Sequence, residues 1–435
     1  MGCLKAVAVI FFAGLLFSGT ISKEEYLEKV KTGSHMYKSA LAAALSAKKQ
    51  MEEQQLLSSP WAFTEFQHGV DKSPSLEAFM SGDTRAFNRL AFGFEQRTDL
   101  GLSARVSYEV QHYSLEGIEP IVIPLGGSTI SLDFITTPKY YSDKLEAEVK
   151  LDLLRNSFGS EVRSQKQALS FKNEAVYYEK VYQAKQVLMQ AETAYWELAL
   201  SREAVKLHET LLDRAHQLNT WMQGKINLNL QDESDINQSK SEVQYRKLEL
   251  KGALDAEKSA ARVFNYLRGV EFKKVEETLD LPEEKDLESM LKTVHPEKRF
   301  DFLSLLKNLE AAKASAALKK EVLLPELYIG ASASLNGQDA DFTSAMSASF
   351  GTSKYVYGAG VNLKVPLDFP ADTLSKAYEE EWKSLETYTE GKRFEIKMEW
   401  EELNRKLADV KERLALAVEL ERLQKNKADA EIERL

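Results

Sequence analysis

The sequence predicts a protein of mixed α and β structure, built from two similar halves. In each half a proline-led strand is followed by a loop, a second alternating strand and a very long helical stretch. The paired segments are Pro60-Trp61 with strand 144–154, and Pro325-Glu326 with strand 355–365. No proline lies between Pro138 and Pro282 or beyond Pro370. Because proline breaks helix interiors, these gaps permit helices far longer than the globular norm.

Composition bounds the possible functions of the 435-residue chain. Its formal net charge is −10, so we do not expect nucleic-acid binding, which requires clustered Lys and Arg. The single cysteine, Cys3, excludes a disulfide framework and a cysteine-based zinc site. The histidines are scattered without metal-ligand spacing, and there is no glycine-rich phosphate loop or nucleophile–base pattern. We therefore expect no enzyme activity, no cofactor and no metal.

Residues 1–22 have the pattern of a secretory signal peptide. Lys5 supplies positive charge, residues 6–17 form an apolar core, and the small residues Thr20 and Ser22 suit cleavage before Lys23. The apolar core is short for a bilayer span. A retained membrane anchor is the alternative.

The strand at 144–154 alternates most clearly. One face carries Leu145, Ala147, Val149, Leu151 and Leu153, and the other carries Lys144, Glu146, Glu148, Lys150 and Asp152. Strands that alternate in this way, over about ten residues, are typical of membrane β-barrels, which are apolar outside and polar inside. A soluble sheet with its apolar face on a core is the alternative.

Other strands are predicted in the first half, over about 60–154. A helix over 23–59 ends at Pro60, and Trp61–Val70 then reads as a strand. Alternating residues near 86–114 predict a hairpin, and a loop with Pro120, Pro124, Gly126 and Gly127 follows. The sequence does not decide whether this hairpin joins the other strands or lies outside them.

Long helices dominate the rest of the chain. A helix from Ser160 to about Met222 and another over about 234–266 predict a helical hairpin spanning about 160–268, with its tip at 224–235. At 1.5 Å per residue, a helix of roughly 60 residues is about 90 Å long. Small residues at steps of three and four predict coiled-coil packing. A simple soluble coiled coil is the alternative, but it does not explain the amphipathic strands.

We therefore divide the chain into a signal peptide (1–22), a first repeat (23–270), an acidic connector (271–294) and a second repeat (295–435). A helix is expected from about Thr373 to Leu435. On this division the second repeat lacks the returning helix of its hairpin.

Several motifs occur in a consistent order along the chain. They are Leu153-Leu154-Arg155-Asn156-Ser157-Phe158-Gly159, Ala194-Tyr195-Trp196-Glu197-Leu198, Gly224 followed by Glu233-Ser234-Asp235-Ile236, His295-Pro296-Glu297-Lys298-Arg299, Ala311-Ala312-Lys313-Ala314, Leu323-Leu324-Pro325 and Gly360-Val361-Asn362-Leu363-Lys364-Val365-Pro366-Leu367. Together they resemble the TolC-type outer membrane factor family of Gram-negative efflux and secretion systems. Each motif is weak by itself, and the resemblance rests on their order over nearly the whole mature chain.

The resemblance implies a homotrimer. Each protomer would give strands to one shared outer-membrane β-barrel, continued by a long periplasmic α-helical coiled-coil barrel. It also implies a passive export channel of a tripartite efflux or type I secretion system, which docks on a periplasmic adaptor (membrane fusion) protein while an inner-membrane pump supplies energy. Outer-membrane lipid would surround the strands.

Two sets of residues are candidates for this function. The pore-lining candidates are Lys144, Glu146, Glu148, Lys150 and Asp152, whose mixed signs predict weak charge selectivity. The candidates for the periplasmic tip and adaptor contact are Gly224, Lys225, Asp232 and Asp235. The alternatives are ordinary inward-facing residues without a selective role, and a plain helix turn.

The sequence also departs from the family pattern. The first half holds about fifty residues more than the second between its proline-led strand and its helix-entering strand. Two further functions therefore stay open, a non-conducting periplasmic coiled-coil structural or adaptor-like protein and a truncated inactive family member.

Overall fold

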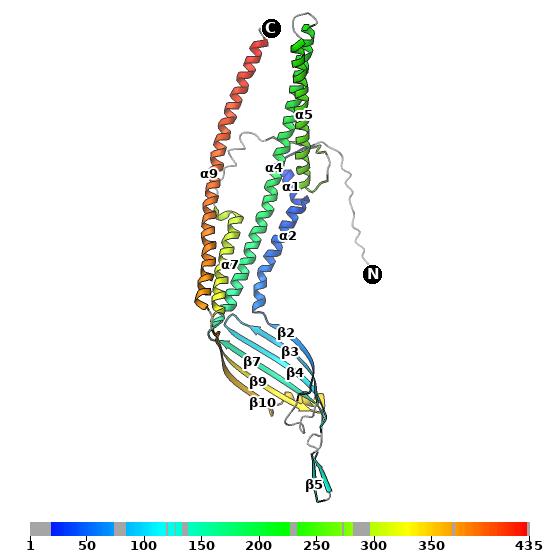
Figure 1. Ribbon diagram of the computed structural model, residues 1–435, viewed down its shortest axis with the longest axis vertical. Coiled ribbons are helices and arrows are strands. Elements are labelled where there is room, and N and C mark those ends of the chain that lie inside the picture. Colours follow the sequence, from blue (N-terminus) through cyan, green and yellow to red (C-terminus); the bar gives the residue numbers. More distant parts are fainter. Residues whose placement is uncertain are drawn as a thin grey trace, which may run out of the picture. The chain divides into compact units, whose positions relative to one another are not determined.

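The computed structural model describes residues 19–73, 84–118, 121–126, 128–132, 138–226, 233–271, 274–281, 296–367 and 370–432. The chain divides into two compact units. One, the helical unit, comprises Met1–Ser46 and Val176–Asp301, and the other, the sheet unit, comprises Ala47–Ala175 and Phe302–Leu435. Figure 1 shows the helices and strands of both units.

The helical unit is built on two long helices. α4 spans Ser160–Ile226 and begins in the sheet unit, and α5 spans Glu233–Leu267. The two helices lie within the range 160–268 of the predicted helical hairpin. Two short strands, β1 (Thr20–Ile21) and β8 (Thr278–Leu279), pair in parallel beside these helices.

The predicted helix over 23–59 is wrong as a single element. It is divided into α1 (Lys23–Gly33), α2 (His35–Gln50) and the 3-10 helix η1 (Met51–Leu57). Ser34 is extended between α1 and α2, with ψ of 121°. A Cβ on Gly33 would lie 2.2 Å from the carbonyl oxygen of Arg268, so the close approach of the α5 end requires glycine there.

The core of the helical unit is aromatic. The rings of Tyr26 and Phe264 stack with centroids 4.0 Å apart, and Tyr195 lies beside both. The Tyr195 hydroxyl donates to the Ile21 carbonyl at 2.8 Å and accepts from the Asp280 amide at 2.9 Å. Burial raises the pKa of both Tyr26 and Tyr195. These contacts fix β1 and the β8 segment against α4.

Residues on either side of the predicted signal-peptide boundary take part in this fold. Ile21 is buried in the aromatic core, and the Ser22 side chain caps α1 through the Glu25 amide. The boundary before Lys23 stays a prediction.

The sheet unit contains six described strands in one antiparallel sheet, in the order β10-β9-β7-β4-β3-β2. The strands are β2 (Trp61–Asp71), β3 (Thr84–Arg97), β4 (Leu102–Glu116), β7 (Lys139–Asp152), β9 (Glu326–Asp339) and β10 (Tyr355–Lys364). They lie side by side in Figure 1. The predicted hairpin near 86–114 is β3–β4, and it lies inside the sheet between β2 and β7.

Two connections between strands differ from a plain loop. The predicted loop around Pro124 contains a small hairpin of β5 (Ile121–Leu125) and β6 (Ser128–Leu132). The segment between β9 and β10 contains a helix, α8 (Phe342–Ser349), which the sequence analysis did not predict. Asp341 caps α8, because its carboxylate accepts from the Ser344 amide.

Helix α7 (Phe300–Val322) precedes β9 in the chain, and helix α9 (Ala371–Ile432) follows β10. Ion pairs connect the second half of α7 to the first part of α9, at distances of 2.7 Å, 2.8 Å and 3.3 Å, and these are Lys313–Glu386, Lys319–Glu381 and Lys320–Glu379. The first part of α4 contacts α7 through the Lys307–Glu174 pair at 3.1 Å. Cross-helix pairs of this kind set the register of long helices packed against one another.

The junction from β7 to α4 is held tightly against the turn between β3 and β4. It contains the 3-10 helix η2 (Ser157–Gly159), with positive φ at Asn156, Phe158 and Gly159. A Cβ on Gly159 would lie 2.0 Å from the Asp99 carbonyl oxygen. Lys166 of α4 reaches Asp99 from the other side, at 2.7 Å. The turn of the β3–β4 hairpin is therefore fixed against the start of α4.

Candidate functional site

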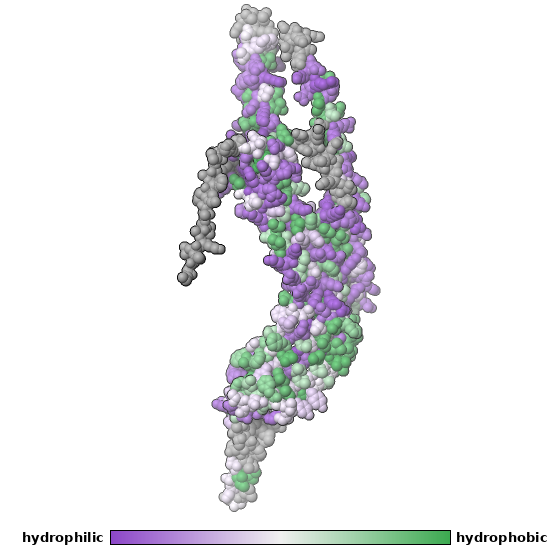
Figure 2. Space-filling view, turned by 180° about the vertical axis from the view of Figure 1, so that it is seen from behind, coloured by the Kyte–Doolittle hydropathy of each residue, from purple (hydrophilic) through white to green (hydrophobic). Residues whose placement is uncertain are grey.

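One face of the sheet is apolar and exposed. Pairing registers place Phe66, Leu90, Val110 and their neighbours on the same side as Leu145, Val149, Ile329, Val361 and Leu363. Phe66 is 72% exposed, Phe94 66% and Val361 68%. Figure 2 shows hydrophobic surface gathered over the sheet, whereas hydrophilic surface predominates over the helices. An exposed apolar patch that covers several strands marks a surface that meets lipid or protein.

The opposite face carries the predicted pore-lining residues. Lys144, Glu146, Glu148 and Lys150 alternate with the apolar residues of β7 and form two ion pairs, Lys144–Glu146 at 2.8 Å and Lys150–Glu148 at 3.2 Å. Asp152 is on the same face at the end of β7, where it accepts from the Asn156 side chain at 2.7 Å. Asp152 therefore takes part in the β7–α4 junction. The role of all five in lining a pore stays a prediction.

The polar face extends across the inserted hairpin, which the sequence analysis did not assign to it. Arg89 of β3 pairs with Glu109 of β4 at 2.6 Å and with Glu65 of β2 at 3.8 Å. Arg105 reaches Glu65 at 3.6 Å and Glu95 at 3.8 Å. The alternation in 86–114 was visible in the sequence. What the sequence did not give was the position of the hairpin, and therefore which of its faces joins that of β7.

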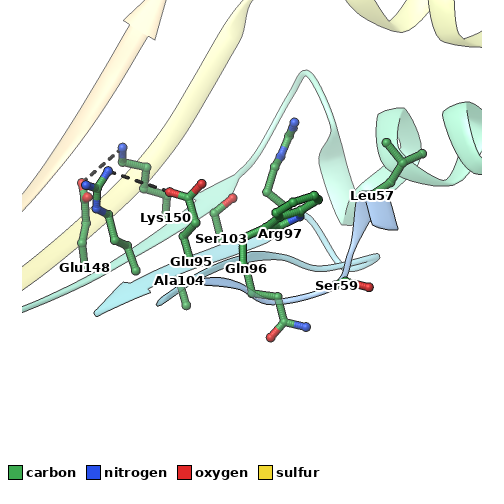
Figure 3. Close-up of a pocket in the computed structure, with 11 residues that line it drawn as sticks. Leu57, Ser59, Glu95, Gln96, Arg97, Ser103, Ala104, Glu148 and Lys150 are labelled. Carbon is green, nitrogen blue, oxygen red and sulfur yellow. Dashed lines mark ion pairs between the residues drawn. The ribbon is translucent and has the colours of Figure 1, made fainter. Parts of the chain in front are cut away.

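A hollow of about 380 Å³ lies on the polar side, near the start of β2. Leu57, Ser59, Arg97 and Ser103 line it together with Glu95, Glu148 and Lys150. Figure 3 shows Glu148 and Lys150 of β7 joined by their ion pair, with Glu95 two strands away on β3. Positive and negative groups alternate here, an arrangement that favours water and small ions of either sign over one charged ligand.

The short helix α8 covers part of the apolar face. The Tyr108 hydroxyl donates to Asp143 at 3.0 Å and lies 3.1 Å from the Ser349 hydroxyl. Tyr108 also stacks on Phe350, with ring centroids 5.7 Å apart. Asp143 is a charged residue on the mainly apolar face, and it is completely buried where α8 contacts that face.

The predicted tip residues are only partly described. Gly224 is exposed near the end of α4, and Asp235 is half-buried in the first turn of α5. Lys225 belongs to α4, but its side chain lies outside the described residues, as does all of Asp232. Below the tip, Ser239 of α5 donates to the Asn219 side chain of α4 at 2.9 Å. This bond joins the two helices, and adaptor contact stays a prediction.

Two kinds of feature are absent from the described residues. These residues contain no group of three or more His, Cys, Asp or Glu side chains positioned to hold a metal ion. Nor does any helix in the described ranges combine the length and apolar character needed to cross a bilayer.

The architecture, with a two-faced antiparallel sheet joined to very long helices, is a fold also found in outer membrane channel proteins. Solved structures of such channels resemble it. The outer-membrane channel OprN matches with a TM-score of 0.61 and 12% identity, over 92% of this chain and 76% of its own. CusC, described as undergoing conformational changes on folding and transmembrane channel formation, matches with a TM-score of 0.57 and 11% identity, over 85% and 72%.

A third match is the outer membrane protein VceC of Vibrio cholerae, with a TM-score of 0.55 and 12% identity, over 85% of this chain and 75% of its own. No family model matches the sequence, and no curated protein matches it. At these identities the matches establish the fold alone. The chain therefore has the fold of the TolC-type outer membrane channels, as the resemblance predicted, and these neighbours are channels rather than enzymes.

Proposed function

We propose that this chain is one protomer of an outer membrane channel that exports solutes passively. Three copies would share one β-barrel in the outer membrane, and their long helices would form a tunnel in the periplasm. The tip near Gly224 and Asp235 would dock on a periplasmic adaptor protein, and an inner-membrane pump would supply the energy. The channel would thus serve a tripartite efflux or type I secretion system.

The observation that carries this proposal is the two-faced sheet. Phe66 and Val361 are largely exposed on one face, and the ion pairs of Arg89 and Lys150 occupy the other. In a membrane barrel the apolar face meets lipid and the charged face meets a water-filled lumen. Strands in which charged residues alternate with apolar ones have no such explanation in a periplasmic coiled-coil adaptor, which is the competing function.

Adjacent residues on β7 provide the test. In a Cys3→Ser background, Lys150→Cys should react with a water-soluble, membrane-impermeant thiol reagent in intact outer-membrane vesicles. Val149→Cys, one residue away on the apolar face, should react only after the lipid is dissolved in detergent. Purified trimer should also produce stepwise ion conductance in planar lipid bilayers.

Two results would contradict the channel proposal. A protein that is extracted without detergent, runs as a monomer and leaves the bilayer current unchanged is a soluble periplasmic protein, and the channel proposal is then wrong. Equal labelling of Val149→Cys and Lys150→Cys in intact vesicles would show that both faces meet water, with the same consequence.

A further inference from the structure

The β3–β4 hairpin is an integral part of the sheet. β3 pairs with β2 from Arg85 opposite Asp71 to Glu95 opposite Trp61, and β4 pairs with β7 from Leu102 opposite Leu151 to Ser114 opposite Lys139. In the middle of both registers the two faces continue across the hairpin: Ala62, Phe94, Val106 and Ala147 share the apolar side, and Glu65 and Glu109 share the charged side with Lys144. A hairpin folded outside the wall would instead leave β2 paired directly with β7.

The two edges of this sheet are suited to each other. Among the described strands, β2 and β10 lie at opposite edges, with lengths of 11 and 10 residues. Lengths of 9–11 residues suit a tilted strand that crosses the hydrocarbon layer. Because neighbouring strands in the sheet are antiparallel, β2 and β10 run in opposite directions, so β10 of one copy meets β2 of the next as an antiparallel partner.

Side chains at both edges are open to a partner strand. Every residue of β10 is exposed, and Gly360 leaves open space over the backbone on its charged face. The charged face of β10 ends in Lys364, whose side chain is 81% exposed, and that of β2 carries Glu65 near the middle of the strand. In lipid an unpaired strand edge is not tolerated, so both edges require a partner.

From this geometry we infer that the β3–β4 hairpin forms part of the channel wall, so that three copies of the six described strands close into an eighteen-stranded barrel through β10–β2 pairing. This inference rests on the proposed function. Each copy contacts the next head to tail, and a rotation of one third of a turn closes the ring.

The inserted hairpin decides the width of the lumen. With strands about 4.8 Å apart and tilted by about 40°, eighteen strands give a backbone diameter of about 36 Å. The same three copies without the hairpin have twelve strands and a diameter of about 24 Å. Barrels of 16–18 strands enclose an aqueous channel. The hairpin therefore raises the cross-section about twofold and suits the channel to bulkier exported solutes.

Cysteine pairs test the wall directly, in a Cys3→Ser background. Val106→Cys with Ala147→Cys lies on a directly paired β4–β7 position, so an intramolecular disulfide is expected. Ala62→Cys on β2 and Ala147→Cys on β7 would be three strand spacings, or about 14 Å, apart. This pair should therefore form no intramolecular disulfide. A disulfide in the second pair and none in the first would place the hairpin outside the wall and overturn the inference.

A second set of cysteine pairs tests whether β10 of one copy lies beside β2 of the next. Val361→Cys on the apolar face of β10 is combined in turn with Ala62→Cys, Thr64→Cys and Phe66→Cys on the same face of β2. At least one pair should yield covalent trimers on non-reducing gels, whereas Val361→Cys with Glu65→Cys, on opposite faces, should not. If none of the three same-face pairs yields covalent trimers, β10–β2 closure is contradicted.

A size measurement completes the test. Deletion of Thr84–Glu116 removes β3 and β4 and leaves β2 antiparallel to β7. The largest maleimide-tagged polymer that labels Glu146→Cys from outside should become smaller, with a lumen cross-section about half that of the parent. An unchanged cut-off in a folded deletion variant would contradict a widening role. These readouts do not depend on conduction, so a loss of bilayer current with the expected disulfides would refute the proposed function while leaving the wall intact.

Discussion

The guanidinium of Arg155 lies 2.8 Å from the carboxylate of Glu326. Arg155 stands at the β7–α4 junction of the first half, and Glu326 is the first residue of β9 in the second half. A second carboxylate, that of Glu161, approaches the same guanidinium at 2.9 Å and is only 13% exposed. One side chain therefore joins both halves of the sheet at its base.

We expect Arg155→Met to destabilise the sheet unit by about 2–3 kcal/mol. The substitution removes charge-assisted hydrogen bonds and leaves the Glu161 carboxylate without its partner. The free energy of unfolding is measured by urea titration in detergent micelles. The matched control is Arg405→Met, which removes an exposed pair with Glu402 on α9 and should leave stability nearly unchanged. Equal effects of the two substitutions would show that the Arg155 contacts do not stabilise the junction.

Gly159→Ala is expected to disrupt the contact between the junction and the β3–β4 turn. Gly159 has φ of +76°, and its new Cβ would lie 2.0 Å from the Asp99 carbonyl oxygen. Backbone strain and the required displacement should together lower stability by more than about 2 kcal/mol. Gly391→Ala in α9, where nothing lies within 4 Å, should instead stabilise the helix by about 0.5–1 kcal/mol. Thermal unfolding of both variants provides the comparison, and similar shifts would contradict the close approach.

Two neighbouring residues of β4 should differ in how well they tolerate a new charge. Val106 is on the apolar face and 48% exposed, and Ser107 is on the charged face. If lipid covers the apolar face, Val106→Lys should reduce the free energy of folding into bilayers by about 2–4 kcal/mol at mid-depth. Ser107→Lys should have an effect below about 1 kcal/mol. Folding yield into lipid vesicles as a function of urea measures both, and equal tolerance would show that the apolar face does not meet lipid.

The helical unit should lose stability in acid through Glu277. Its carboxylate pairs with Arg268 at 2.7 Å. Burial acts to raise the pKa of Glu277, but the hydrogen bond and charge of Arg268 outweigh it, so the pKa lies below its ordinary value of 4.5. Because the folded-state pKa is the lower one, this stabilisation is complete above pH 4.5 and is lost as the pH falls through the folded-state pKa.

Glu277→Gln tests that pH dependence. The variant should be less stable than the parent at neutral pH, and the difference should shrink as the pH falls below 4.5. Unfolding followed by circular dichroism at several pH values gives the measurement. Glu203→Gln, in an exposed pair with Lys206, is the control and should follow the parent throughout. A difference that is constant with pH would exclude the Glu277 carboxylate as its source.

Tyr195→Phe should weaken the attachment of the first strand to α4. The hydroxyl bonds both the Ile21 carbonyl and the Asp280 amide in a buried position, and its loss leaves these groups unpaired. We expect a loss of about 1–3 kcal/mol and faster amide exchange at Asp280. Tyr388→Phe, on a side chain that is 62% exposed, should have little effect. Unchanged exchange at Asp280 would contradict this tethering role.

Local patterns predicted most elements because their causes are local. The alternation from Lys144 to Leu153 defines the two faces of β7, and the proline-free run after Ser160 permits α4. The break at Ser34 was not predictable, since it depends on the packing of Gly33 against the end of α5. Helix α8 was missed because eight residues with small side chains have little periodic pattern, and its position depends on contacts with Tyr108 and Phe350.

Periodicity and the absence of proline act within each segment, so the amino-acid sequence was enough to predict two-faced strands and very long helices. Only the tertiary structure decided that the β3–β4 hairpin lies between β2 and β7. It also placed Arg89 and Arg105 on the same face as Lys150. The physical reason is that strand pairing joins residues far apart in the chain, and alternation specifies the two faces of a strand without specifying its neighbour.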